Sequence, residues 1–163
     1  MAKNAELSRL KAALVSAQRD KQRAWERQNF TWQHLLLIKA HNNDLIKQLN
    51  TAYIRVLDRM QMAHGEAATA FAKQDHASTR AHATNARRHR AQAATMIEGR
   101  RKLVEEIRSA TIAHREARDS YRIAKATYAL ARQHFFERLM AVRAEEQREA
   151  TEGTALRPDS KSA

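Results

Sequence analysis

The sequence contains no cysteine, one proline and three glycines among its 163 residues. The absence of cysteine excludes disulfides, thiolate zinc sites and cysteine nucleophiles. Glycine and proline at this frequency are too few to turn a chain repeatedly through a β-sandwich, a barrel or a βαβ fold. Because the only proline is Pro158, no helix before it is interrupted by a proline ring. These absences predict an all-α protein.

Long hydrophobic runs are also missing. No apolar run is longer than that of residues 35–38, whereas a transmembrane helix needs roughly 18 apolar residues or more. Residues 1–6 lack the charged-then-apolar pattern of a secretory signal. We therefore expect no membrane span and a cytoplasmic location.

The signatures of catalysis are absent as well. The sequence has no glycine-rich phosphate-binding loop and no nucleophile elbow. His34 and His41 are seven residues apart, as are His82 and His89. On a helix this spacing places each pair about 10 Å apart, too far to share one metal ion. We predict that the protein is not an enzyme and has neither a cofactor nor a metal site.

The first half of the chain has a heptad repeat, which is typical of coiled-coil helices. With Leu7 at position a, the register continues as far as Ala63. Trp25 and Trp32 fall at position e, so the apolar stripe is wider than a two-helix seam needs. Asn42 falls at position a, where a buried asparagine can fix the register.

The second half carries two rows of seven-residue spacing, one of large and one of small side chains. The large row is Ile107, His114, Tyr121, Tyr128, Phe135 and Val142, and the other is Leu103, Ala110, Ala117, Ala124 and Ala131. Such alternation lets two helices approach closely. From both halves we predict a helix-packing set of Leu35, Ile38, Leu45, Leu49, Ile107, Ala117, Tyr121, Ala124, Tyr128 and Phe135.

These patterns predict a long antiparallel helical hairpin or coiled coil, with a small elongated helical bundle as the alternative. Residues 1–150 are expected to form a single elongated helical domain, with a first arm over about 5–72 and a return arm over about 77–150. The segment 151–163 has lost all periodicity, and we predict a disordered tail there.

Three places are candidates for the turn between the arms. Gly65 could serve as a helix C-cap directly after the first register. Asp75 could act as the N-cap of a return helix, which would make two arms of similar length. Gly99 is a third break point, just before a basic triplet.

Positive charge is concentrated in the middle of the chain. The formal net charge is +12, and residues 64–102 contribute +5 of it, from 8 basic and 3 acidic residues. The candidate partner-binding residues are Arg80, Arg87, Arg88, Arg90, Arg100, Arg101 and Lys102. Such a cluster could contact phosphates or an acidic protein surface. Four consecutive helix residues point in different directions, so residues 87–90 cannot all face one groove.

In its layout the chain resembles the small coiled-coil stalk proteins of flagellar and type III secretion export ATPases. The matching features are the register over 7–63, the return register over 103–142 and the Glu/Arg/Gln-rich segment 143–149. The resemblance implies a helical hairpin inserted in the central hole of a hexameric ATPase, which it couples to an export gate.

Three functions remain open at this point. The first is a non-enzymatic coiled-coil protein that presents a basic face to an acidic or ring-shaped protein partner, such as the stalk or adaptor of a secretion ATPase. The second is a basic helical protein that binds nucleic acid with the same charges. The third is a self-assembling coiled coil that uses its wide apolar stripe to form homo-oligomers.

Overall fold

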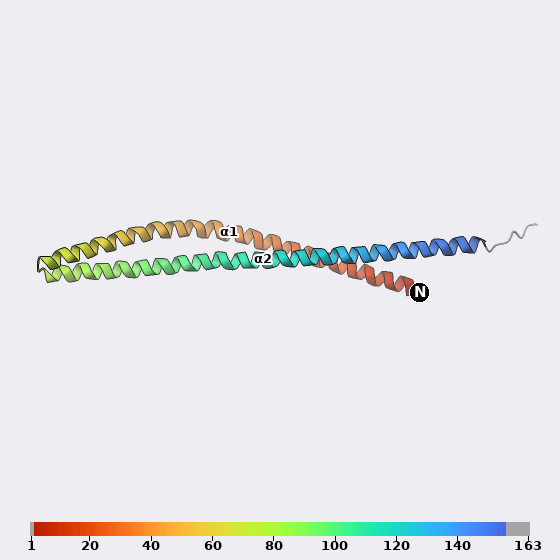
Figure 1. Cartoon of the computed structure of the whole chain (residues 1–163), viewed down its shortest axis with the longest axis horizontal. Helices are drawn as coiled ribbons and strands as arrows, with labels where there is room; N and C mark the ends of the chain where they lie inside the picture. The colour runs from red at the N-terminus through yellow and green to blue at the C-terminus, as the bar shows by residue number, and fades with distance from the viewer. Residues whose placement is uncertain (1, 156–163) are drawn as a thin grey trace, which may run out of the picture. The chain divides into compact units, whose positions relative to one another are not determined.

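The computed structural model describes the backbone of residues 2–155 and the side chains of residues 4–151. It contains two helices, α1 (Ala2–Ala72) and α2 (His76–Ala155), which pack antiparallel as a helical hairpin (Figure 1). The predicted all-α fold and the antiparallel hairpin are therefore confirmed. Neither helix contains, within the described residues, a segment long and apolar enough to cross a bilayer.

The turn lies at Lys73–Asp75, the second of the three predicted places. The amide N–H of Gln74 donates to the carbonyl of Phe71 at 2.9 Å, and that of Asp75 donates to the carbonyl of Ala70 at 3.0 Å. With Gln74 at a φ of 60°, these two bonds form a Schellman motif that satisfies the last carbonyls of α1. The chain thus ends one helix with its own backbone, even without glycine at the left-handed position.

Asp75 also begins the second helix. Its Oδ1 accepts a hydrogen bond of 3.0 Å from the backbone N–H of Ser78, which is the N-cap interaction expected from the sequence. The hydrogen bonds from the Ser78 side chain and backbone lower the pKa of Asp75 from its ordinary value. Gly65 and Gly99, the other two candidates for the turn, lie inside α1 and α2.

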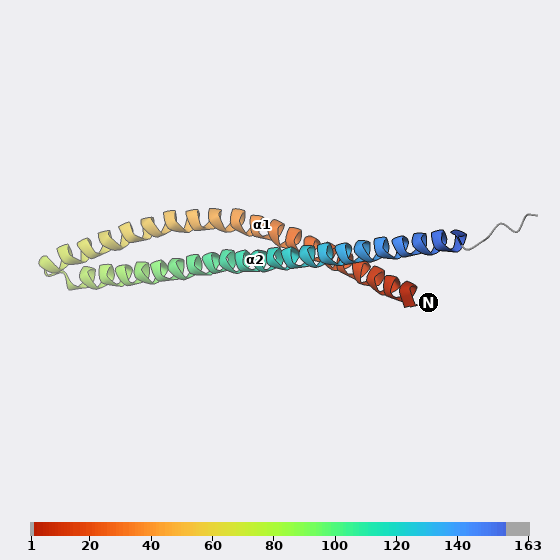
Figure 2. The ribbon, with the colours of Figure 1, turned by 45° about the vertical axis from the view of Figure 1, so that its right-hand side comes forward.

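The chain forms two compact units, and both helices contribute to each of them. The first unit comprises the described residues up to Phe30 together with those from Arg115 onward, and the second unit is Thr31–His114. In the second unit, α1 and α2 run side by side from the turn (Figure 2). The prediction of a single domain over 1–150 stays a prediction.

The seam of each unit is formed by small and medium-sized side chains. In the second unit the most buried are Leu35, Asn42 and Val56 of α1 and Ala86 of α2. In the first unit they are Ala17 of α1 and Ala117 and Val142 of α2. The alanines on α2 permit close approach of the helices, as the row of small residues predicted.

The predicted packing residues all lie at buried or half-buried positions. Leu35 and Ala117 are buried, and the half-buried ones are Ile38, Leu45, Leu49, Ile107, Tyr121, Ala124, Tyr128 and Phe135. The heptad register fails at one place on α1: Arg59, at a d position, is exposed, and the neighbouring Met60 is half-buried instead. A straight α-helix has 3.6 residues per turn, so the contact stripe drifts away from a strict heptad.

The end of α2 lies beyond the predicted arm. The helix continues to Ala155, whereas the return arm was expected to end near residue 150. The rest of the predicted tail, residues 156–163, lies outside the described residues.

Candidate functional site

The basic segment of α2 lies on the surface of the second unit. All seven predicted partner-binding residues are exposed: Arg80, Arg87, Arg88, Arg90, Arg100, Arg101 and Lys102. Between His76 and Leu103 the chain holds only one acidic residue, Glu98. The local charge is therefore strongly positive and little compensated within the helix.

Four arginines of this unit share one row along α2. Arg80, Arg87, Arg101 and Arg108 differ in position by multiples of seven, so they follow one another along the same side of the helix. We call these four residues the arginine row. Arg80 and Arg87, like Arg101 and Arg108, are seven residues and thus about 10.5 Å apart along the helix axis, whereas Arg87 and Arg101 are about 21 Å apart because Ala94 takes the position between them. Other cations of the basic segment lie on another side of the helix: Arg88 and Lys102 are fourteen residues apart and share a strip about 100° around the helix from the row.

Most of these cations have no acidic partner. Arg101 lies 3.8 Å from the carboxylate of Glu98, and Arg108 lies 3.8 Å from that of Glu105. The other cations of the basic segment form no ion pair with any residue between Asn4 and Thr151: Arg80, Arg87, Arg88, Arg90, Arg100 and Lys102. Exposed guanidinium groups without carboxylates nearby keep their full capacity to bind an external anion.

Gly99, and not its neighbour Arg100, faces the seam on this part of α2. The seven-residue row that includes Ala93 and Ile107 passes through Arg100, but Arg100 is exposed and Gly99 is half-buried. A Cβ atom built on Gly99 would lie 3.7 Å from Cδ1 of Leu49 on α1. The helix therefore presents its bare backbone to Leu49 here.

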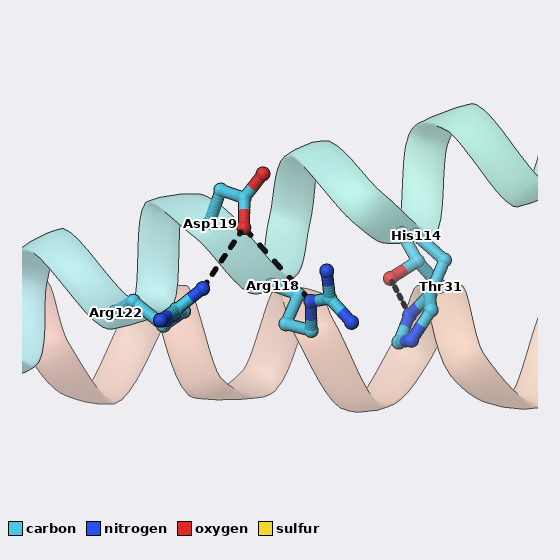
Figure 3. Close-up of polar contacts among 5 residues, drawn as sticks. All are labelled: Thr31, His114, Arg118, Asp119 and Arg122. Atoms are coloured by element: carbon cyan, nitrogen blue, oxygen red, sulfur yellow. Dashed lines mark hydrogen bonds and ion pairs between the residues drawn. The ribbon is translucent and has the colours of Figure 1, made fainter.

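The polar residues of the seam hold the two helices in register. The side-chain amide of Asn42 donates to the carbonyl oxygen of Leu103 at 3.1 Å and to the carboxylate of Glu106 at 2.9 Å. The hydroxyl of Thr31 lies 3.4 Å from Nδ1 of His114, on the facing helix (Figure 3). Near the turn, His82 and Glu66 form a third link, with 2.9 Å between Nδ1 and the carboxylate. These histidines thus have structural partners.

No group of three or more potential metal ligands is formed by the side chains that the structure describes. Seven of the eight histidines lie in the second unit, but they are spread along both helices. His89, inside the basic segment, is half-buried, with Nδ1 at 3.4 Å from the side-chain oxygen of Gln92.

The first unit has its own charged contacts. Asp119 lies between Arg118 and Arg122, at 3.9 and 4.0 Å (Figure 3). Arg138 of α2 donates from Nε to the carboxylate of Glu6 on α1 at 2.9 Å. This pair joins the two helices of the first unit.

Many large hydrophobic side chains stay exposed on both helices. On α1 they include Trp25, Trp32 and Leu37, and on α2 they include Ile123 and Phe136. The two tryptophans are the e-position residues of the wide stripe, and about half of each is exposed. Exposed apolar residues of this size indicate a surface that a partner or a further copy covers.

Two features of the surface escaped the sequence reasoning. Arg108 belongs to the arginine row but lies outside the predicted set of partner-binding residues. A search for seven-residue spacing among the charged residues, as among the apolar ones, would have identified it. Lys21 falls at position a of the first register, and its Nζ lies 4.0 Å from the ring centroid of Tyr128 on α2. Only the facing helix reveals that contact.

Comparisons with protein-family models, with curated proteins and with solved structures found no match to this chain.

Proposed function

We propose that this chain is a non-enzymatic protein-binding hairpin, which docks on an acidic protein partner through the basic segment of its second unit. The observation that carries the proposal is the arginine row, whose members are exposed and recur at multiples of seven. A surface that serves only solubility is expected to carry interspersed charges of both signs. A row of one sign with the period of a coiled coil is suited to recognition.

The spacing favours a protein over nucleic acid as the partner. A helix with acidic residues every seventh position presents carboxylates about 10.5 Å apart, which is the spacing of Arg80 and Arg87 and again of Arg101 and Arg108. Arginine binds carboxylates through two parallel hydrogen bonds, so each level of such a pair can be bidentate. Steering by the opposite charges would accelerate association and set the orientation of the partner.

Within this class, the proposed role is that of a stalk or adaptor of a secretion ATPase. The support is the resemblance in layout to the coiled-coil stalk proteins of flagellar and type III secretion export ATPases. The antiparallel hairpin agrees with that layout. In this role the hairpin would enter a ring-shaped hexamer and contact acidic residues that line its opening.

The test is a comparison of partner recovery between the native chain and a charge-reversed variant. Tagged protein would be cross-linked in the source cell and purified with either the native sequence or Arg80→Glu/Arg87→Glu/Arg101→Glu. We expect a ring-forming ATPase with the native chain and its loss with the variant. Measured with the purified partner, the dissociation constant should rise at least tenfold, which is about 1.4 kcal/mol.

A matched control changes as many charges elsewhere in the same unit. Lys39, Arg55 and Arg59 are exposed on α1, and their triple substitution by glutamate should leave the partner bound. Equal loss in both variants would refute the assignment of the site to the arginine row. Recovery of nucleic acid alone, with an affinity that falls linearly in a log–log plot against salt, would refute protein docking in favour of nucleic-acid binding.

A further inference from the structure

A groove in the first unit combines aromatic rings with cations and contains no carboxylate. It has a volume of about 450 Å³, and Lys21 of α1 borders it on one side. The other lining residues come from α2: Tyr121, Lys125, Tyr128, Ala129, Arg132, Gln133 and Phe136. We call it the aromatic groove. Its two walls come from different helices, so it exists only where the hairpin has formed.

The groove offers apolar surface to a ligand. Tyr121 and Tyr128 are half-buried, and Phe136 is 47% exposed although it packs edge-on against Phe135 at 5.5 Å between ring centroids. Leaving a phenylalanine so exposed forgoes the stabilisation that its burial would give. A partner that covers Phe136 would recover it.

Cations lie over the rings of this groove. The ammonium group of Lys21 is 4.0 Å from the centroid of Tyr128, and the guanidinium carbon of Arg132 is 5.7 Å from that of Phe136. Lys21, Lys125 and Arg132 form no ion pair with another residue of the described chain. Cation–π contact holds Lys21 and Arg132 in place and leaves their donors for an anionic ligand.

The same contacts argue against single-stranded nucleic acid in the groove. Such ligands bind mainly by stacking bases on open aromatic faces. Here Lys21 covers one face of Tyr128, and Arg132 covers one face of Phe136. The rings of the aromatic groove are therefore better suited to contact aliphatic side chains at their edges than to stack with bases.

The cations also have a helical period. Arg118, Lys125 and Arg132 are seven residues apart on α2, next to Tyr121 and Tyr128, which are themselves seven apart. Arg118 forms an ion pair with Asp119, whereas Lys125 and Arg132 form none within the described chain. A ligand helix with apolar residues toward the rings and carboxylates two turns apart would match both rows.

We propose that the aromatic groove binds an acidic amphipathic helix of a protein partner, with its apolar side against Tyr121, Tyr128 and Phe136 and its carboxylates toward Lys125 and Arg132. This site is separate from the arginine row, because the two lie in different units. Either site can therefore fail without the other.

The experiment uses the full chain and a fluorescent helical peptide of about 21 residues, with leucine at heptad positions a and d and glutamate at most others. Fluorescence anisotropy should report binding that weakens with added salt, because the contacts are in part ionic. Lys125→Glu/Arg132→Glu should weaken it at least about tenfold. Phe136→Ala, which leaves the charge unchanged, should weaken it about threefold or more.

The controls separate this groove from net charge and from general hydrophobicity. Arg27→Glu/Arg143→Glu makes the same change in charge on exposed residues of the first unit outside the groove, and it should leave the affinity within about twofold. Leu130→Ala removes another exposed apolar side chain and should do the same. Far-UV circular dichroism of each variant would check that the hairpin is intact.

Several outcomes would overturn the proposal. One is equal weakening by the control pair, which would indicate attraction by the net charge alone. Another is undiminished binding of a peptide with glutamine in place of the leucines, since the rings would then contribute nothing. The third is a single-stranded oligonucleotide that competes for the groove and binds more tightly than the peptide. Substitutions in the arginine row should leave the peptide affinity unchanged, which distinguishes this test from that of the proposed function.

Discussion

Replacing Asn42 tests whether its buried amide stabilises the hairpin or instead selects its register. Asn42 is only 2% exposed, and it donates to the carbonyl of Leu103 and the carboxylate of Glu106. Glu106 is exposed and regains water when the amide is removed. Leu103 keeps the helical hydrogen bond of its carbonyl. Neither partner is therefore left without a hydrogen bond.

The expected magnitudes follow from that accounting. Asn42→Ala loses two hydrogen bonds of about 1 kcal/mol each and should lower the free energy of unfolding by about 1–2 kcal/mol. Asn42→Leu loses the same bonds but buries an apolar side chain worth about 1.5–3 kcal/mol. We expect the leucine variant to be at least as stable as the native chain, and more stable than the alanine variant by about 2 kcal/mol.

We expect the leucine variant to be less specific in its helix register and in its choice of partner. A leucine at this position fits many registers and partners, whereas an asparagine requires an acceptor opposite. Urea denaturation followed by circular dichroism would give the stabilities, and sedimentation velocity would give the distribution of oligomers, which should broaden for Asn42→Leu. If the leucine variant is as unstable as the alanine variant, the hydrogen bonds of Asn42 stabilise the fold and the reasoning is wrong.

Four further substitutions, with one control, test the helices and their turn. Gly65→Ala and Gly99→Ala should each stabilise the hairpin by about 0.5–1 kcal/mol in urea denaturation, because both glycines lie inside helices and a Cβ meets no clash. Asp75→Asn keeps the N-cap but removes its charge. The pKa of Asp75 is lower in the folded chain than its ordinary value of 3.8. The charged carboxylate therefore stabilises the fold at pH values above 3.8, and this stabilisation is lost as the pH falls through the lower pKa of the folded state. The melting temperature of the native chain should therefore exceed that of Asp75→Asn at neutral pH and approach it in acid; a constant difference would contradict this. Ala117→Glu should cost about 3 kcal/mol or more, because Ala117 is 1% exposed, whereas Ala126→Glu at an exposed site should cost less than about 0.5 kcal/mol.

The fold could be predicted because heptad spacing and the scarcity of helix breakers are local properties of the sequence. The turn could only be narrowed to three places, since Gly65, Asp75 and Gly99 all have plausible cap chemistry. The structure selects Asp75, where a Schellman motif and an N-cap coincide. Gly99 instead lies inside α2 opposite Leu49, where a Cβ would make only an ordinary van der Waals contact.

The surface was predicted less completely than the seam. The basic segment was recognisable from composition, and its residues are exposed. The aromatic groove was not recognisable, because Tyr121 and Tyr128 belong to the large seam row and appear there as ordinary packing residues. Their second role depends on how far each ring protrudes and on the position of Lys21, which are properties of the packed helices.

The proposed docking attributes the regular spacing of the arginine row to a partner. Each helix of a hairpin buries a single stripe, and solubility requires only interspersed charges of both signs, so neither requires that Arg80, Arg87 and Arg101 share one row. If the row recognises a partner, then moving one charge off it should matter even at constant net charge. Arg87→Ala combined with Asn85→Arg transfers a guanidinium to another exposed side of α2, because positions two apart point in nearly opposite directions on a helix. We expect weaker binding to the acidic partner, by about threefold or more, with unchanged solubility and unfolding. Unchanged affinity would mean that only the total charge counts, and the period of the row would then carry no functional information.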